Sequence, residues 1–495
     1  MQASRLSPIR RNASFSSFLS AREAVKELEE RLSFSQFPLT PTELAADDIV
    51  RKHKMREIEA GLRNSKDFLA GQHFFRVKEK IEQSEVFKLI QLMPKGALLH
   101  AHNTAMVSSD WLIKNATYRP GLIIFTDQKN ITRFTFKIPN SNQEWNYVSD
   151  LRNASKNVTA FDEWLETKIN LYTPNPEIDY PDIDTVWTAF QNMFTTTSEL
   201  ITFRPVFVDY HRQILKELSD DNVMYVELRI KFETIYDDTE KIYTPADYVE
   251  ILLEVIEDFK KENPNFLGAK VILSCLRNDL VENNLDDIEI YSDLMQLYPD
   301  FIIGIDVASQ EKVTNTNIRF SEVLLNLPES TKFFLHAGET NWYGTGVDEN
   351  LIDAILLNTT RIGHGFALVK HPYLMEIVKK HKIGIEVSPV SNQVLHLVSD
   401  MRNHPASVYL SQDLPVTISS DDPGFWGVKG LSYDYYYAFM GIASASAGLE
   451  TLKKFTWTSL EQSILTDKEW MVACEMFHKQ WNKFIEDLIQ NHSSE

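Results

Sequence analysis

The sequence predicts an α/β protein with a (β/α)8 barrel of the TIM type, an N-terminal helical arm and an insertion after the first strand. Short apolar segments rich in β-branched residues alternate with helix-length amphipathic stretches, which is typical of a parallel sheet covered by helices. Polar side chains stand at or near the C-terminal ends of these segments, where barrels gather their chemistry. We expect eight strands, at residues 96–102, 223–229, 269–274, 301–307, 332–336, 361–364, 383–388 and 415–420.

The arm is predicted over residues 21–92, where apolar residues recur at helical spacing. We expect one helix over 21–32 and another over 77–92. Between them, the run Thr-Pro-Thr-Glu at residues 40–43 marks the start of a further helix, with Thr42 as its candidate cap.

The barrel is expected over residues 93–495, after an extension of unclear role at 1–20 and the arm. The chain between the first two predicted strands, about 103 to 222, is far longer than one crossover helix requires. We therefore expect a small inserted domain at about 112–180.

Composition excludes several classes of protein. The chain has 495 residues, 70 acidic and 50 basic, for a formal net charge of −20, which argues against nucleic acid as a partner because phosphate contacts need clustered Lys and Arg. An uncharged nucleoside is still compatible. No apolar run approaches the roughly 20 residues of a membrane-spanning helix. Cys275 and Cys474 are too few for a disulfide framework and are expected to be core thiols, so any metal must use His, Asp or Glu.

Two signals bear on compartment. The first 22 residues carry four arginines, several serines and no acid, but no apolar segment typical of a secretory signal, so they resemble a transit peptide. A cluster of N-x-S/T sequons favours an extracellular protein, with a cytoplasmic location as the alternative. The sequons are at Asn12, Asn115, Asn130, Asn153, Asn157, Asn358 and Asn491.

A set of histidines and one aspartate indicates a metal centre. His100 and His102 are two apart on a predicted strand, so both side chains point to the same face. His336, His364 and Asp421 each follow a later strand of the same barrel. Each residue alone has an ordinary explanation, as a hydrogen-bonded core side chain or a helix cap. Together they form a set of imidazoles and a carboxylate suited to zinc with an open position for water.

Five separated motifs carry a resemblance to a known family. They are MPKGALLH at 93–100, HAGET at 336–340, TRIGHGFAL at 360–368, SNQVL at 391–395 and SDDP at 420–423. In this order they resemble the adenosine deaminase-related growth factor family, the secreted branch of the adenosine deaminases. The resemblance runs from about residue 21 to the C-terminus.

The resemblance implies a role for each matching residue. One Zn²⁺ would be held by His100, His102, His336 and Asp421. Glu339 would be the proton shuttle to N1 of the purine, and His364 would orient the attacking hydroxide. Substrate contacts are expected from Asp422, at the purine N7, and from Trp187, an aromatic residue of the pocket. Glu227, in the second predicted strand, is a further candidate for substrate binding.

The family also implies partners. It implies a purine nucleoside substrate, a homodimer through the helical arm, an insertion that binds a receptor or glycan, and growth-factor activity.

The sequence departs from the family at the positions expected to read the nucleoside. Asn103 replaces an Asp that reaches the ribose hydroxyls, and Ser309 replaces a Gly whose backbone N–H approaches the purine N3. Gln191 stands where Glu is common, and Cys275-Leu276 where Asp-His is usual. Cysteines typical of the family's insertion are absent. Affinity for ribose is therefore expected to fall or to depend on another group.

Three functions are compatible with these observations. The first is zinc-dependent hydrolytic deamination of adenosine or deoxyadenosine to inosine and ammonia. The second is a catalytically impaired secreted protein that keeps the barrel and zinc and binds a nucleoside or signals. The third is zinc-dependent hydrolysis of a non-nucleoside amide or amidine, because one barrel fold hosts many chemistries.

Overall fold

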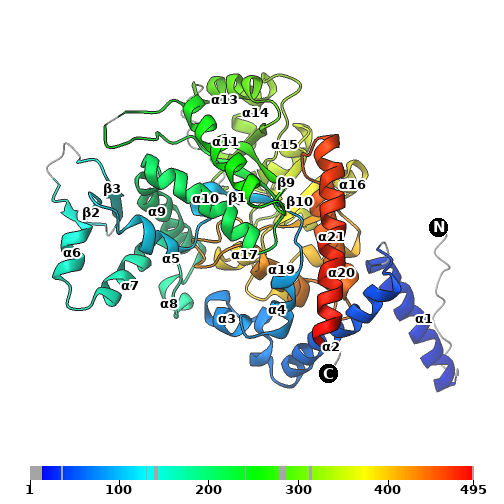
Figure 1. The fold of residues 1–495 in the computed structure, drawn as a ribbon. Helices are drawn as coiled ribbons and strands as arrows, with labels where there is room; N and C mark the ends of the chain where they lie inside the picture. The colour runs from blue at the N-terminus through cyan, green and yellow to red at the C-terminus, as the bar shows by residue number, and fades with distance from the viewer. Residues whose placement is uncertain are drawn as a thin grey trace.

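Eight parallel strands form the centre of the molecule (Figure 1). The computed structural model describes residues 14–34, 37–129, 131–138, 143–239, 241–277, 286–311 and 315–492. One group of strands has the order β1-β5-β6-β7 and the other β11-β10-β9-β8. Their bounds are β1 Ala97–His102, β5 Tyr225–Ile230, β6 Gly268–Leu276, β7 Ile302–Ala308, β8 His336–Ala337, β9 Arg361–His364, β10 Gly384–Val387 and β11 Val416–Ile418.

Two parallel bridges close these groups into a barrel. Ala101 pairs with Asp421 at one seam, and Ile305 pairs with Phe333 at the other. At the second seam Gly304, with φ of 158°, allows close approach, because a Cβ there would lie 2.3 Å from the carbonyl oxygen of Lys332. The predicted (β/α)8 barrel is thereby confirmed, and each of the eight predicted segments overlaps one of its strands.

Helices cover the outside of the barrel, with α20 and α21 side by side along one edge (Figure 1). A capping box at Thr244 and Asp247 begins α11, one of the longest of them. The helices that follow the insertion are α9 Ile183–Ile201, α10 Arg204–Asp220, α11 Pro245–Glu262, α13 Asp286–Leu297, α14 Ser321–Leu325, α15 Asn350–Leu356, α16 Pro372–His381, α17 Pro389–Val394, α18 Ala406–Ser411, α19 Ser432–Tyr437, α20 Leu449–Glu461 and α21 Asp467–His492.

The N-terminal arm is helical, with two local differences from the prediction. Its helices are α1 Phe15–Phe34, α2 Pro41–Arg63, α3 Phe74–Ile81 and α4 Glu85–Leu92. The cap of α2 is Thr40 and not Thr42, because Thr40 forms the capping box with Glu43 and Pro41 takes the first helical position. The single helix expected over 77–92 is two, since the Ser84 side chain accepts the Phe87 N–H and begins α4.

The chain between β1 and α9 forms a three-stranded antiparallel sheet with short helices, at the left of Figure 1. The strands β2 Ile123–Thr126, β3 Thr132–Thr135 and β4 Asn146–Tyr147 have the order β3-β2-β4. They are flanked by α5 Ser109–Trp111, α6 Val148–Ala154, α7 Val158–Ile169 and α8 Pro176–Asp179. The sheet packs on the barrel side, where the Phe136 and Phe203 rings stack at 4.2 Å.

The structure shows how exposed the sequon asparagines and the two cysteines are, and whether a helix could cross a membrane. Asn115, Asn153, Asn157, Asn358 and Asn491 are exposed, whereas Asn12 and Asn130 lie outside the described residues. Both cysteines are free thiols, Cys275 buried and Cys474 half-buried. Within the described ranges, no helix combines the length and apolar character needed to cross a membrane.

Candidate active site

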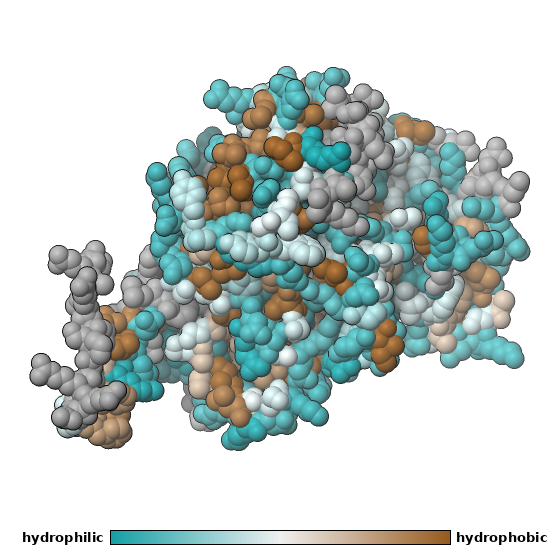
Figure 2. Space-filling model, turned by 180° about the vertical axis from the view of Figure 1, so that it is seen from behind, coloured by the Kyte–Doolittle hydropathy of each residue, from teal (hydrophilic) through white to brown (hydrophobic). Residues whose placement is uncertain are grey.

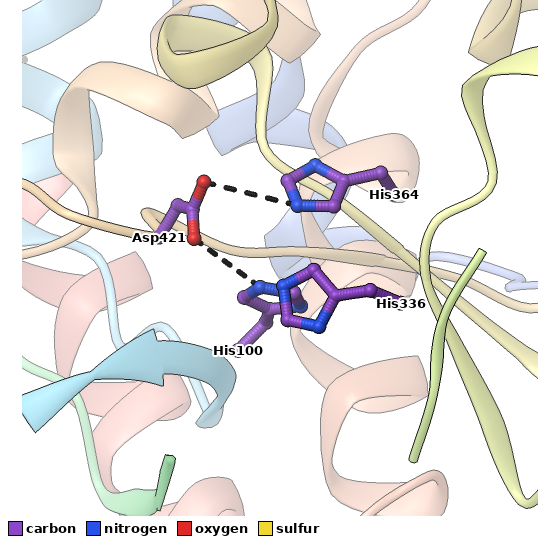
Figure 3. Close-up of side chains that lie close together, drawn as sticks. All are labelled: His100, His336, His364 and Asp421. Carbon is purple, nitrogen blue, oxygen red and sulfur yellow. Dashed lines mark ion pairs between the residues drawn. The ribbon is translucent and has the colours of Figure 1, made fainter. Parts of the chain in front are cut away.

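Four side chains from different strands meet at the C-terminal end of the barrel (Figure 3). His100 lies on β1, His336 on β8, His364 on β9, and Asp421 follows β11. One ligand atom from each lies within 4.8 Å of every other. The Asp421 carboxylate is central, since its Oδ1 lies 3.2 Å from His100 Nε2 and its Oδ2 lies 3.8 Å from His364 Nε2. This cluster has the donor atoms and spacing to hold a metal ion.

His102 approaches the same carboxylate from the cavity side. Its Nε2 lies 3.4 Å from Asp421 Oδ1, and its ring centroid lies 5.3 Å from that of His336. It forms a second metal-capable group with Asp421 and Asp422. The structure therefore brings the other three predicted ligands, His100, His102 and His336, around Asp421, with His364 beside them.

Buried carboxylates orient two of these imidazoles. His100 Nδ1 lies 2.8 Å from Glu386, and His336 Nδ1 lies 2.9 Å from Asp306. In this arrangement the Nε2 atoms face the centre, as in metal sites where a carboxylate fixes the ligand's tautomer. His100 Nε2 is buried and has no hydrogen-bond partner among the described residues, which fits a nitrogen that binds a metal.

Arg229 and Arg361 neutralise the carboxylates beneath the site. Arg229 contacts Asp306 at 2.9 Å and Glu386 at 2.6 Å, and Arg361 contacts Glu386 at 2.6 Å. Burial opposes ionisation of Glu386, but the two guanidinium groups and His100 lower the pKa of Glu386 well below its usual range. These carboxylates therefore stay charged and hold the imidazoles.

Glu227, expected to bind substrate, lies below the cavity and does not line it. Its oxygens contact Arg361 at 2.5 Å and the backbone N–H of Ile464 at 2.6 Å. The reason is depth: Glu227 precedes Arg229 by two residues on β5, about 6.6 Å along a strand, and Arg229 already forms the cavity floor.

Two further acids line the site in a form suited to proton donation. Burial, together with the charges of Asp421 and Glu311, raises the pKa of Glu339 well above its usual range. Burial and Asp421 do the same to the pKa of Asp422, whose Oδ1 is buried without a partner among the described residues. Glu339 Oε1 lies 3.7 Å from His364 Nε2. Burial thus favours the protonated form of both carboxyl groups.

The position of Glu339 depends on a residue that the sequence did not single out. Glu311 accepts the backbone N–H groups of Gly338 at 3.2 Å and Glu339 at 3.0 Å, and also the Asn350 side chain at 2.6 Å. It thus fixes the loop after β8.

His364 is held by a chain of side chains. Asn392 Nδ2 lies 3.2 Å from His364 Nδ1, and Asn392 Oδ1 lies 2.9 Å from His404 Nε2. His404 Nδ1 in turn accepts the backbone N–H of Ala406. This pattern assigns the Nε2–H tautomer to both histidines, so His364 directs a donor toward Asp421 and Glu339. Asn392 belongs to a motif noted in the sequence, but its link to His364 was not predicted.

Three residues at the site have left-handed backbone conformations. His364 has φ of 61°, Asp421 of 59° and Ser309 of 94°. Such conformations are strained for residues with a Cβ and persist where the surrounding structure enforces them, often at functional sites.

A cavity of about 560 Å³ opens above the metal-capable cluster. One wall is a face of α9, which presents Trp187, Phe190, Phe194 and Ser198 at helical spacing. The three-stranded sheet adds Arg133 and Phe134 from β3. Other expected substrate contacts in the lining are Asn103, Ser309 and Asp422, with Glu339, His364, Gln191 and Leu276.

Asn103 is buried in the cavity wall, and its amide donors are used within the protein. The amide nitrogen lies 3.1 Å from the Tyr248 hydroxyl and 3.3 Å from His211 Nε2. His211 Nδ1 lies 2.9 Å from the Phe207 carbonyl, so Nε2 carries the lone pair that accepts the Asn103 N–H.

The fold and the cluster together define a (β/α)8-barrel protein with a potential metal centre below a cavity lined by two buried acids, Glu339 and Asp422. Sequence comparisons give the family. Residues 173–475 match the family model described as adenosine deaminase, and residues 7–90 match adenosine/AMP deaminase N-terminal. The chain belongs to the adenosine deaminase family, as its motifs indicated.

Its relatives are similar over nearly their whole length. The chain is 43% identical to an adenosine deaminase of Phlebotomus duboscqi, over 88% of this chain and 85% of the relative. It is 40% identical to adenosine deaminase 2-A of Danio rerio, with 94% and 93% covered, and 38% identical to adenosine deaminase 2 of Homo sapiens, with 94% and 92% covered.

Solved structures support the fold. An adenine deaminase from Arthrobacter aurescens has a TM-score of 0.54 at 16% identity, covering 79% of this chain and 99% of that one. The N6-methyl-AMP deaminase from Arabidopsis thaliana has a TM-score of 0.55 at 15% identity, covering 80% and 99%.

Proposed function

We propose that the protein is a zinc-dependent adenosine deaminase that converts adenosine or deoxyadenosine and water into inosine or deoxyinosine and ammonia. The observation that carries this proposal is the buried Glu339, with its raised pKa, beside His364 and the cluster centred on Asp421. Family membership and the similarity to proteins named adenosine deaminase support the substrate.

The donor set fits one zinc ion. We assign His100, His102, His336 and Asp421 as its ligands, which leaves His364 to act on water. Imidazole and carboxylate ligands suit Zn²⁺ in a catalytic site with an open position. When bound, Zn²⁺ supplies the Lewis acidity that makes water nucleophilic at neutral pH.

The side chains of the site then have distinct tasks. Glu339, protonated through its raised pKa, donates its proton to N1 of the purine, which makes C6 electrophilic. Asp422, also protonated, donates a hydrogen bond to N7. His364, fixed by Asn392, orients the water that adds to C6. One proton of that water returns to Glu339 and the other passes to N6, so that the C6–N6 bond breaks, C6 becomes a carbonyl and ammonia leaves.

The aromatic wall suits the purine. Trp187 and Phe190 line the cavity with their rings edge-to-face at 5.4 Å, and Phe190 stacks on Trp426 at 5.3 Å. A rigid apolar surface of this kind binds a flat heterocycle at little cost in conformational entropy.

The test is turnover by purified, zinc-loaded protein, followed as the absorbance change from adenosine to inosine together with ammonia release. Glu339→Gln should lower kcat by about 100-fold or more, as expected for loss of a general acid, while retaining the metal. Absence of turnover on adenosine, deoxyadenosine and other aminopurine nucleosides would contradict the proposal.

A second function, nucleoside binding with impaired catalysis, is favoured by one observation. Asn103 carries no charge, and Leu276 places an apolar side chain on the wall where the family resemblance implies histidine. Tight inosine or adenosine binding with negligible turnover would establish it.

We also propose that the protein is a secreted, glycosylated homodimer with a growth-factor role. Five sequon asparagines are exposed, and α1 projects from the body with the exposed apolar side chains Phe15, Phe18, Leu19 and Leu28, which we assign to the dimer contact (Figures 1 and 2). Glycan at Asn115 or Asn157 in native material, and a monomer after deletion of α1, are the expected results. A receptor or glycan partner is assigned to the three-stranded sheet and its helices.

A further inference from the structure

The carboxylate of Glu233, just beyond β5, lines the cavity with one oxygen unsatisfied. Its Oε1 accepts a hydrogen bond from the Ser198 hydroxyl at 3.0 Å. Its Oε2 is buried and has no hydrogen-bond partner among the described residues. Burial raises the pKa of Glu233. Because an unsatisfied buried acceptor is costly, its persistence in a cavity wall points to a donor supplied by a ligand.

Glu233 lies on the same side of the cavity as Asn103. The Asn103 amide donates to the Tyr248 hydroxyl at 3.1 Å, and Phe232, the neighbour of Glu233, packs edge-to-face on the Tyr248 ring at 5.0 Å. Burial and the nearby charge of Glu233 raise the pKa of Tyr248. Asn103 and Glu233 therefore flank one tyrosine.

The cavity wall changes from apolar to polar toward Glu233. Phe190 and Phe194 on α9 form the apolar part, and Ser198 follows one turn later, about 6 Å along the helix axis. A ligand with a flat apolar part and a hydroxyl-bearing part matches this order, with the hydroxyls at Ser198 and Glu233.

We propose that Glu233 is the specificity-determining carboxylate that accepts a hydrogen bond from a sugar hydroxyl of the nucleoside. Ser198 holds one oxygen, which leaves the other for the substrate. Glu233 thus supplies the free carboxyl oxygen that Asn103 lacks. This inference rests on the proposed deaminase function and names the group that reads its sugar.

The test compares adenosine with its 2′-, 3′- and 5′-deoxy forms as substrates of the zinc-loaded protein. Wild type should prefer adenosine to one deoxy form by about 10- to 100-fold in kcat/KM, the range for a hydrogen bond to a charged group. Glu233→Gln turns the free acceptor into a donor. Its kcat/KM should fall by this factor with adenosine and hardly change with that deoxy form. Glu199→Gln removes a charge from the same wall and should change kcat/KM for all four substrates by the same factor.

Two results would overturn the inference. One is that Glu233→Gln lowers kcat/KM equally for all four substrates. The other is that this variant still prefers adenosine to the deoxy form as strongly as wild type does. If Glu233→Gln does not fold, Ser198→Ala, which releases the carboxylate, should show the same selective pattern at smaller size, and an equal loss there overturns it too. Failure of wild type to turn over any nucleoside would instead contradict the proposed function.

Discussion

At the scale of single residues, Asn103 shows how an amide nitrogen, in place of a carboxylate oxygen, sets the hydrogen bonds of the buried cavity wall. Its amide donates to the lone pair of His211 Nε2 and to the Tyr248 hydroxyl oxygen. Burial lowers the pKa of His211 to about 4, so this imidazole is neutral near pH 7. An aspartate would turn an acceptor toward the lone pair of His211 Nε2, although the Tyr248 hydroxyl could rotate to donate to it.

Asn103→Asp is therefore expected to destabilise the fold near neutral pH by about 1–3 kcal/mol, the cost of an unsatisfied buried group. The new carboxylate should raise the folded-state pKa of His211. Wild type loses stability as pH falls below the unfolded value near 6.5, because its folded-state pKa of about 4 keeps His211 neutral, so a raised pKa in the variant should make the variant less destabilised at low pH than near pH 8. The measurement is chemical denaturation of wild type and variant at about pH 5.5 and about pH 8, on either side of that value. A difference between the two proteins that is the same at both pH values would contradict this reasoning.

Ser309 has φ of 94° in the cavity wall, where glycine is favoured. Ser309→Gly should raise the free energy of unfolding by about 0.5–1 kcal/mol, since relief of left-handed strain exceeds the added entropy of the unfolded chain. Thermal and denaturant unfolding measure it. Ser309→Ala, which keeps the Cβ, is the matched control and should give no gain; equal gains in both variants would show that strain is not the cause.

At the scale of elements, β9 brings two histidines together because it carries glycine. A Cβ at Gly363 would lie 3.0 Å from His100 Cε1 and 3.1 Å from His336 Cα, tighter than ordinary packing allows. The His336 Cα is backbone and the His100 ring is held by Glu386 at 2.8 Å, so neither can move freely.

Gly363→Ala is expected to lower zinc affinity by about 10-fold or more, comparable to the loss of an outer partner of a metal ligand, while the barrel still folds. Metal content after dialysis measures zinc retention, and circular dichroism measures folding. At Gly344 a Cβ meets nothing within 4 Å, although φ is 70°, so Gly344→Ala strains the backbone without touching the cluster. Metal retention by Gly363→Ala equal to that of Gly344→Ala would contradict the steric argument.

The elements were largely predictable, and the contacts between them were not. Each strand is a short buried segment that ends in polar residues, so local pattern suffices to find it. The helix break at Ser84 escaped because Val86, Phe87 and Ile90 continue the apolar spacing across it. The cap of α2 was misplaced by two residues although Pro41 marks the first helical position.

The site residues were likewise predictable from local pattern, whereas the contacts between them were not. Strand ends identify His100, His336, His364 and Asp421, because eight parallel strands must present their C-terminal ends together. Depth along a strand is not visible in such a pattern, which is why Glu227 was expected in the cavity. The pairs Glu386–His100 and Asp306–His336 join strands far apart in sequence and required the closed barrel.

At the scale of the whole molecule, the metal centre lies where the barrel closes. Asp421 pairs through its backbone with Ala101, and its side chain is the common neighbour of His100, His102 and His364. Burial opposes its charge, but His100, whose Nε2 lies 3.2 Å away, and the other surrounding imidazoles keep the pKa of Asp421 well below its usual range. One ionised carboxylate thus joins the last strand to the first.

Removal of the metal should therefore weaken the barrel as well as abolish activity. A ligand that binds only the folded state stabilises it by about 2.7 kcal/mol when present at 100 times its Kd, so a chelator should lower Tm by a few degrees in a chain of this size. Zn²⁺ should restore Tm and turnover together, whereas Mg²⁺ should restore neither, because imidazole ligands favour zinc over magnesium. Calorimetry, metal analysis and the adenosine assay on the same sample measure the three quantities. If Tm and turnover stay unchanged while the metal content falls to near zero, the cluster around Asp421 holds no functional metal, and its imidazoles and carboxylate must then act on water alone.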